Sequence, residues 1–100
     1  MVLKIDPENN ESRALFDLAD FAGRRVLEIG CGDGRLTWRY AESAVQVTGV
    51  DPSSEAITRA RENVPNGLRD RVAFHDIAFE TFAAGSAPSR FDLVILSWSL

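Results

Sequence analysis

Carboxylates end short apolar stretches at three places in this sequence. Glu28 lies at the end of the first stretch, and Asp51 and Asp76 end the next two. A carboxylate accepts hydrogen bonds on both oxygens, so Asp51 could hold two adjacent hydroxyls of a ribose. Charge-assisted hydrogen bonds contribute roughly 1.5–3 kcal/mol each. We therefore expect these acids to bind a ligand if the fold brings them together.

A glycine-rich turn follows Glu28. Gly30, Gly32 and Gly34 form a G-x-G-x-G pattern, and glycine allows both positive φ and close approach of the backbone to a ligand. A dinucleotide fingerprint, G-x-G-x-x-G, would need glycine where Arg35 stands, and the Gly-Lys-Ser/Thr of a P-loop is absent. The spacing therefore argues against both of these phosphate-binding motifs.

Strand and helix patterns alternate along the chain and would position these residues. Glu55 and Arg59 are expected to pair four residues apart on an exposed helix face. The predicted elements are a helix through Leu15, Leu18, Ala19 and Ala22 that stops at Gly23; strands at 25–29, 45–50, 71–74 and 91–96; a helix with Leu36, Tyr40 and Ala44 on one face; a helix through 56–64 capped by Ser53 or Ser54; and a short helix or turn over 77–82.

Strands separated by helices indicate an α/β fold with a parallel sheet and right-handed crossovers. We expect a three-layer, doubly wound (Rossmann-like) single domain over residues 1–100, with an N-terminal helical segment at 1–23 and a core at 24–100. The expected strand order is 3-2-1-4. Ligands bind beyond the carboxyl ends of such strands, which is where the acids stand. The outer edge of the fourth strand is expected to be unpaired, which predicts self-association through that edge.

Composition narrows the function classes. A formal charge of −4 and a pI near 4.9 argue against a nonspecific nucleic-acid binder, which needs clustered basic residues. Cys31 is the single cysteine, and no cluster of residues has metal-ligand spacing. The first residues carry acids and no long apolar core, and no apolar run is long enough to span a membrane. We expect a cytoplasmic protein without a metal.

Four segments resemble the motifs of one family, the class I S-adenosylmethionine-dependent methyltransferases. The stretch 26–34, Val-Leu-Glu-Ile-Gly-Cys-Gly-Asp-Gly, resembles the first motif, and 47–53 resembles the second. His75-Asp76-Ile77 is similar to the third motif, and 91–94 to the fourth strand. The resemblance runs from about residue 23 to residue 100, and the family normally continues for three further strands.

The resemblance implies a role for each residue of these motifs. Glu28 and the backbone of Gly30, Cys31 and Gly32 would face the methionine end of S-adenosylmethionine. Asp51, followed by Pro52, would hold the ribose. Asp76 would accept a hydrogen bond from the adenine amino group with Ile77 beside the ring, and Ser97 would end the fourth strand at the same edge. The reaction would be methyl transfer from sulfur to an acceptor that the sequence does not identify, and no catalytic residue is assigned.

Several of these residues also have structural interpretations. Asp51 could cap the helix at Ser53, Asp76 could cap the short helix after it, and Glu28 could pair with Arg24 or Arg35. Asp33 is expected to bond backbone within the turn, and Asp92 to lie at the opposite end of the sheet. Cys31 as a nucleophile, His75 as a base and Trp98 as a pocket residue are the less favoured interpretations.

Two other functions remain open. A nicotinamide-dependent dehydrogenase could use the same turn and acid, although Arg35 disfavours it. A non-catalytic module that binds a cofactor or a partner is the other. The Asn/Asp-Pro-Pro-aromatic motif of nucleic-acid amino-methylating members is absent, because Ser97-Trp98-Ser99-Leu100 stands there, which disfavours a DNA-base amine as acceptor.

Overall fold

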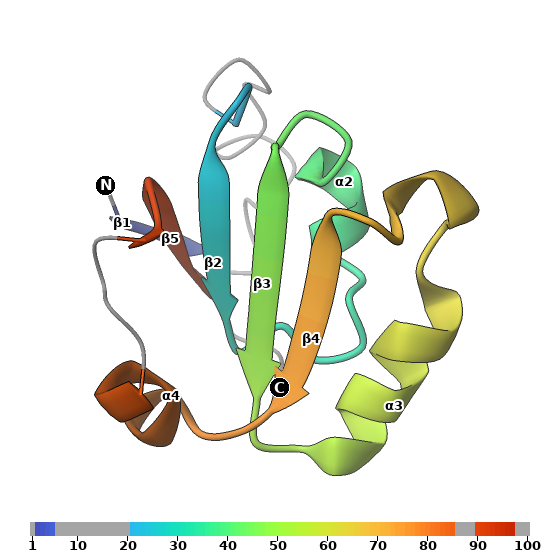
Figure 1. Ribbon diagram of the computed structural model, residues 1–100. Helices are drawn as coiled ribbons and strands as arrows, with labels where there is room; N and C mark the ends of the chain where they lie inside the picture. Colours follow the sequence, from blue (N-terminus) through green and yellow to red (C-terminus); the bar gives the residue numbers. More distant parts are fainter. Residues whose placement is uncertain (1, 6–20, 86–89, 98–100) are drawn as a thin grey trace.

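Five parallel strands form one sheet in the order β1-β5-β2-β3-β4 (Figure 1). The structure is a computed structural model that describes residues 2–5, 21–85 and 90–97. The expected order 3-2-1-4 is confirmed as β4-β3-β2-β5. The elements are β1 Val2–Ile5, β2 Arg25–Ile29, α2 Thr37–Tyr40, β3 Gln46–Asp51, α3 Ser54–Asn63, η2 Asn66–Leu68, β4 Val72–Asp76, α4 Phe79–Gly85 and β5 Leu93–Ser97.

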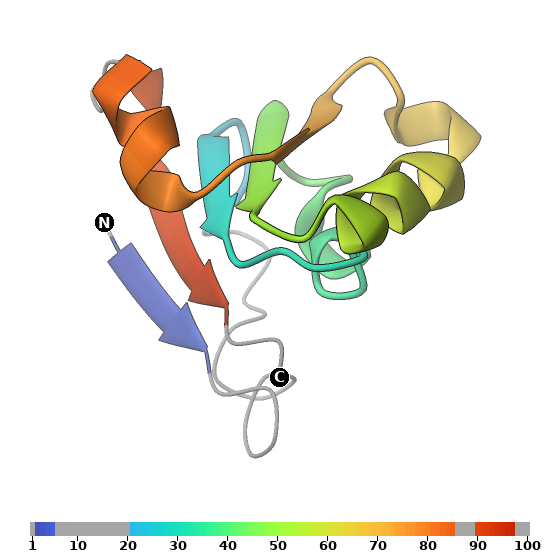
Figure 2. The same cartoon turned by 90° about the horizontal axis from the view of Figure 1, so that it is seen from below.

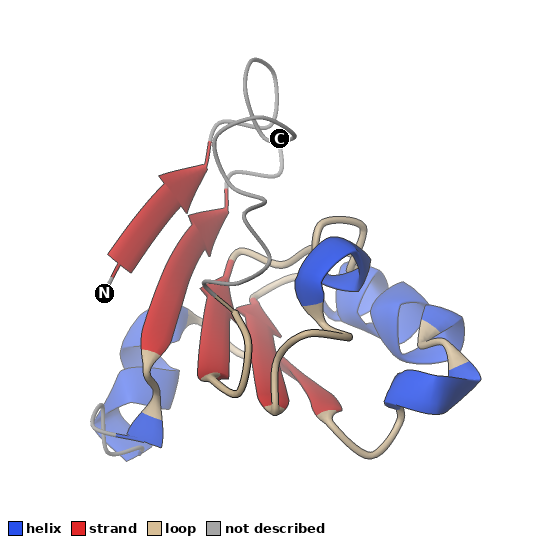
Figure 3. Cartoon of the chain, turned by 90° about the horizontal axis from the view of Figure 1, so that it is seen from above, coloured by secondary structure: helices blue, strands red, loops and turns tan. Residues whose placement is uncertain are grey.

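The helices cover both faces of the sheet. In Figure 2, α2 and α3 lie on one side of the strands and α4 lies on the other. Figure 3 shows the same separation with the strands as the middle layer. The three-layer doubly wound architecture is therefore confirmed, and it arises because each crossover must return over the sheet before the next parallel strand.

The central strand β2 is buried along most of its length, as a strand with neighbours on both sides must be. Val26 is fully buried and Leu27 is 4% exposed. Phe21 and Tyr40 stack with their ring centroids 4.6 Å apart and join Val26 in one hydrophobic cluster. The core thus lies between β2 and the segment that follows the glycine turn.

The helix after the glycine turn is shorter than expected. Leu36, Tyr40 and Ala44 are all buried, so the predicted face is correct. However, α2 spans only four residues, and the Ser43 amide donates to the Tyr40 carbonyl at 2.9 Å. Such an i→i+3 bond tightens the chain into a turn instead of another helical turn.

Two expectations about the N-terminal segment need correction. Val2–Ile5 is a strand that pairs in parallel with β5, with Val2 opposite Val94 and Ile5 opposite Ser97. The segment 1–23 is therefore not wholly helical, and the outer edge of β5 is paired, which removes the reason to expect self-association there. The helix expected over 15–22 lies outside the described residues except at its end, where Gly23 has φ +71°.

The amino ends of β2 and β5 are joined by an exposed ion pair. The Arg25 amide and guanidinium donate to the Asp92 carboxylate at 2.9–3.3 Å. Hydrogen bonds from the Arg25 side chain and backbone hold the pKa of Asp92 below its usual range. Asp92 is therefore at the end of the sheet opposite the acids Asp51 and Asp76, as expected.

Gly30→Ala should destabilise the fold strongly. Gly30 has φ +78°, and a Cβ there would collide with the backbone carbonyl oxygen of Ser97. Left-handed backbone strain and the collision together predict a loss of about 2–4 kcal/mol in the free energy of unfolding, measured by urea denaturation. Gly67→Ala is the control, because no atom lies within 4 Å of the place where the added methyl group would stand; equal losses in the two variants would contradict the argument.

Candidate cofactor site

The glycine turn is tied to the carboxyl end of β3. Gly30, Gly32 and Gly34 have φ of +78°, +57° and +88°, values that favour glycine. The amides of Gly30 and Cys31 donate to the Val50 carbonyl at 2.8 and 3.2 Å. The turn therefore closes over the end of the neighbouring strand, where a ligand of a parallel α/β sheet binds.

Asp51 connects this turn to the start of α3. Its Oδ2 accepts from the Gly32 amide at 3.1 Å, and its Oδ1 accepts from the Ser53 amide at 2.9 Å. Ser53 then caps the helix by accepting from the Ala56 amide at 3.2 Å. The structural interpretation of Asp51 is thus confirmed, since it orders the helix start, and Asp51 also contacts the glycine turn. Each carboxylate oxygen keeps a second lone pair for a ligand hydroxyl.

A hollow of about 400 Å³ opens beside Asp51, which is within the size range of small-molecule sites. Its charges are mixed, because two arginines face two acids, and it contains no lysine. Within it, Asp33 accepts from the Arg35 amide at 3.3 Å, as expected of a turn residue. The lining residues are Gly32, Asp33, Arg35, Asp51, Ser53, Ala56 and Arg59.

The other predicted cofactor residues surround this edge of the sheet without lining the hollow. Asp76 is the Cα partner of Asp51 across β3 and β4, so their side chains project from the same face. Asp76 and Pro52 are exposed, and Ile77 is half-buried. Ser97 ends β5, and its carbonyl lies against Gly30. The fold therefore gathers the predicted residues at one edge, with Asp51 nearest the turn.

Glu28 is fully buried in the centre of the sheet. Its Oε1 accepts from the Thr37 hydroxyl at 2.7 Å and from the Tyr40 hydroxyl at 2.6 Å. Its Oε2 has no hydrogen-bond partner. Burial raises the pKa of Glu28 from 4.5 to about 7, and the two hydroxyl donors only partly oppose this effect. The alternative interpretation, pairing with Arg24 or Arg35, is wrong, because the hydroxyls of Thr37 and Tyr40 partner the carboxyl instead.

Thr37 and Tyr40 are partners of Glu28 that the sequence motifs did not reveal. They stand nine and twelve residues after Glu28, on the short helix that follows the turn. The available signal was indirect: an acid in a buried strand requires donors, and the next helix was the nearest source of them.

Cys31 is a buried thiol and not an activated nucleophile. It is 4% exposed, and burial together with the charges of Glu28 and Asp51 raises its pKa far above the usual value.

We expect Cys31 to react with a disulfide reagent at neutral pH at least about 100-fold more slowly in the folded chain than in urea. Equal rates, measured by absorbance of the released thiolate, would contradict this.

His75 shows no geometry of a general base. Its side chain is exposed, and its ring contacts Phe82 with centroids 6.1 Å apart. Trp98 lies outside the described residues.

In the described part of the chain no group of three or more potential ligands could hold a metal ion. No helix among those residues is long and apolar enough to cross a membrane.

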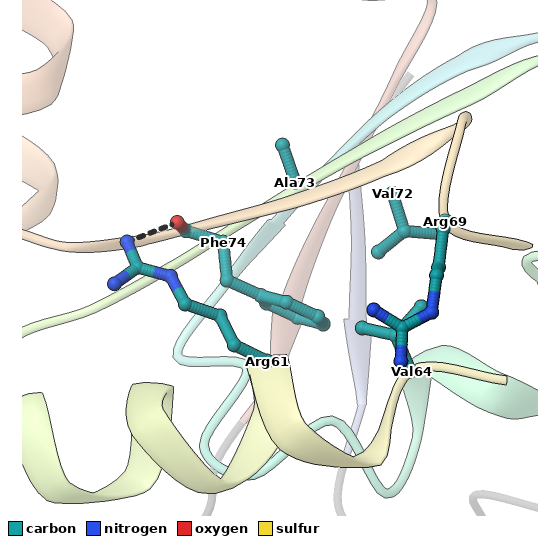
Figure 4. A pocket seen from close by; sticks show the side chains of 6 residues that line it. All are labelled: Arg61, Val64, Arg69, Val72, Ala73 and Phe74. Carbon is teal, nitrogen blue, oxygen red and sulfur yellow. Dashed lines mark hydrogen bonds between the residues drawn. The ribbon is translucent and has the colours of Figure 1, made fainter. Parts of the chain in front are cut away.

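A second hollow of about 290 Å³ lies at the outer edge of β4 (Figure 4). Arg61 reaches from α3 to the Phe74 carbonyl at 2.8 Å, while Arg69 stands on the other side of the Phe74 ring. Val64 and Val72, which lie near Arg69, add apolar surface to the lining. This hollow contains neither the glycine turn nor an acid, so it is distinct from the site at Asp51.

Comparison with known proteins agrees with this geometry. Residues 26–100 match a family described as "Methyltransferase domain". The chain belongs to the class I S-adenosylmethionine-dependent methyltransferases, whose cofactor is S-adenosylmethionine, and the nicotinamide alternative is thereby set aside.

Three similar proteins illustrate the relationship. The ubiquinone biosynthesis O-methyltransferase of Aromatoleum aromaticum is 41% identical over 76 residues, which cover 76% of this chain and 32% of that protein. The magnesium-protoporphyrin O-methyltransferase of Rhodobacter capsulatus is 36% identical over 81% of this chain and 34% of its own length. An S-adenosylmethionine-dependent methyltransferase from Mesorhizobium loti superposes with a TM-score of 0.64 at 25% identity, covering 79% of this chain and 34% of that one. The chain spans about a third of the length of these relatives.

Glu28→Gln should remove a pH-dependent penalty on folding. The folded state holds the Glu28 proton more tightly than the unfolded state, so wild-type stability falls as pH rises from about 4.5 to about 7 and then levels off. From pH 5 to pH 8 the free energy of unfolding of the variant should rise by roughly 2–3 kcal/mol relative to that of the wild type. Urea denaturation of both proteins at each pH measures this, and a pH-independent difference would refute it.

Proposed function

We propose that this chain forms the S-adenosylmethionine-binding part of a methyltransferase that transfers a methyl group from the cofactor sulfonium to an acceptor. One observation carries the proposal: Asp51 is bonded to the glycine turn and borders a hollow of suitable size. An acid at the end of the second core strand, beside a tight turn of the first, suits a ribose with two adjacent hydroxyls.

The residues at this edge suit the chemistry of the cofactor. S-adenosylmethionine has no phosphate and carries a sulfonium and an ammonium, which the unpartnered oxygen of Glu28 and the charge of Asp51 favour. Asp51 and Pro52 would hold the ribose, and Asp76 with Ile77 would receive the adenine. Glu28 and the backbone of Gly30, Cys31 and Gly32 would face the methionine end, with Ser97 beside them.

Bound in this way, the cofactor supplies an electrophilic methyl group. The part of the chain is then to fix the adenosine and the methionine end so that the methyl group meets the acceptor in line, and to exclude water. Both curated relatives described above are O-methyltransferases by name, which supports an oxygen atom as the methyl acceptor. The cytoplasm is the compartment that composition favours.

Asp51→Asn should weaken cofactor binding. The variant keeps the shape of the side chain and one acceptor, but it loses the charge and one of the two oxygens that would hold the ribose hydroxyls. The dissociation constant of S-adenosylhomocysteine, measured by isothermal titration calorimetry, should rise at least about tenfold.

Asp92→Asn is the matched control, because Asp92 is an acid at the opposite end of the sheet. It should bind S-adenosylhomocysteine as the wild type does. Unchanged affinity in Asp51→Asn, with thermal denaturation showing a folded variant, would exclude the ribose role. Binding of a nicotinamide dinucleotide instead of S-adenosylhomocysteine would overturn the proposed function itself.

A further inference from the structure

We propose that Glu28 is a proton-releasing counter-charge for the cofactor, and that Thr37 and Tyr40 are the residues that position it. Without the cofactor the carboxyl carries its proton in about half of the molecules at pH 7. When the cationic methionine end of S-adenosylmethionine binds, the carboxyl loses its proton to the solvent and remains as a carboxylate. This inference rests on the proposed function of the site.

The geometry around Glu28 supplies the first argument. Both hydroxyl donors converge on Oε1, at 2.7 and 2.6 Å, while the equally buried Oε2 has no partner. A buried polar atom without a partner is unfavourable and is usually explained by a missing proton, water or ligand. Thr37 and Tyr40 thus fix one oxygen and leave the other available for a proton in the empty state and for a positive charge in the bound state.

The position of Glu28 places its side chain on the face of the sheet from which Asp51 also projects. Glu28 precedes the turn by two residues, and its Cα partner on β3 is Gly49, two residues before Asp51. Side chains two residues apart project from the same face of a strand. The charges of Glu28 and Asp51 both raise the pKa of Cys31, which lies in the turn between them. A cation bound over the turn would therefore act on Glu28 through little intervening water, where electrostatic interactions are strong.

Among the titratable groups around this position, Glu28 is the one whose protonation would change when a cation binds. Tyr40 and Cys31 are the titratable side chains that face it, from α2 and from the turn, and burial raises the pKa of both, so both stay protonated at neutral pH. Gly49 and Ile95, its Cα partners on β3 and β5, carry no charge. No basic side chain of the described residues bonds to Glu28 to hold it as a carboxylate. Burial instead raises its pKa to about 7, so a bound cation would have a proton to displace.

Isothermal titration calorimetry of the 100-residue chain with S-adenosylmethionine, without an acceptor, tests this. Titrations in phosphate and in Tris differ in buffer ionisation enthalpy, so the change in observed enthalpy counts the protons released. The wild type should release about half a proton at pH 7 and almost none at pH 8.5. The affinity should rise about tenfold from pH 6 to pH 8.

Variants distinguish this inference from a structural role. Glu28→Gln should bind without proton release and with an affinity that changes little with pH. Tyr40→Phe and, in the same way, Thr37→Val each remove a donor that lowers the pKa of Glu28, so proton release should persist to a higher pH than in the wild type. Loss of stability in these variants without such a displacement of the pH profile would show a structural role only.

His75→Asn is the control, because it removes the single imidazole of the chain and leaves Glu28 and its two donors unchanged. Proton release should persist in this variant. Wild-type binding without proton release, or equal release by Glu28→Gln, would overturn the inference and leave the proposed function intact. Failure of the wild type to bind S-adenosylmethionine would overturn both.

Discussion

Three consecutive amides of the glycine turn are bonded to two consecutive residues of β3, and the rest of the site depends on this connection. The Gly30 and Cys31 amides donate to the Val50 carbonyl, and the Gly32 amide donates to Asp51. The connection orients the turn, orients the carboxylate and, through Ser53, starts α3. Glycine suits this turn, because Gly30 and Gly32 take positive φ while their amides are bonded to β3.

The buried acid of β2 is unfavourable to the stability of the fold. A carboxyl removed from water is unfavourable even with two donors, and an apolar residue of similar volume at this position would often give an equally or more stable fold. The chain instead surrounds Glu28 with Thr37 and Tyr40, and it stacks Tyr40 on Phe21 so that the hydroxyl is held in place. The short helix α2 therefore supplies two hydroxyl donors to Glu28 as well as apolar contacts to the core.

The sequence predicted most of what is encoded locally. The glycine spacing, the Ser53 cap, the Glu55–Arg59 pair at 2.8 Å and the order of the four core strands were all confirmed. Contacts between distant residues were missed. The pairing of β1 with β5 joins residues 92 positions apart, and a run of four residues, Val2–Ile5, carries no sign of its partner. The partners of Glu28 were also missed. A threonine and a tyrosine on a helix do not indicate which acceptor their hydroxyls will bond to.

Register explains why acids of different strands lie on one side of the sheet. Val26 pairs with Val47 and Val47 with Val72, so Glu28, Asp51 and Asp76 project from the same face. A shift of one residue in any strand would send its acid to the opposite face. Gly49 helps to hold this register, since a Cβ there would lie 2.7 Å from the Phe74 ring and 2.9 Å from the Cys31 sulfur. That close approach packs β4 and the glycine turn against β3 and keeps both acids at the strand ends beside the turn. A glycine outside the turn is thus needed to pack both the turn and β4 against β3.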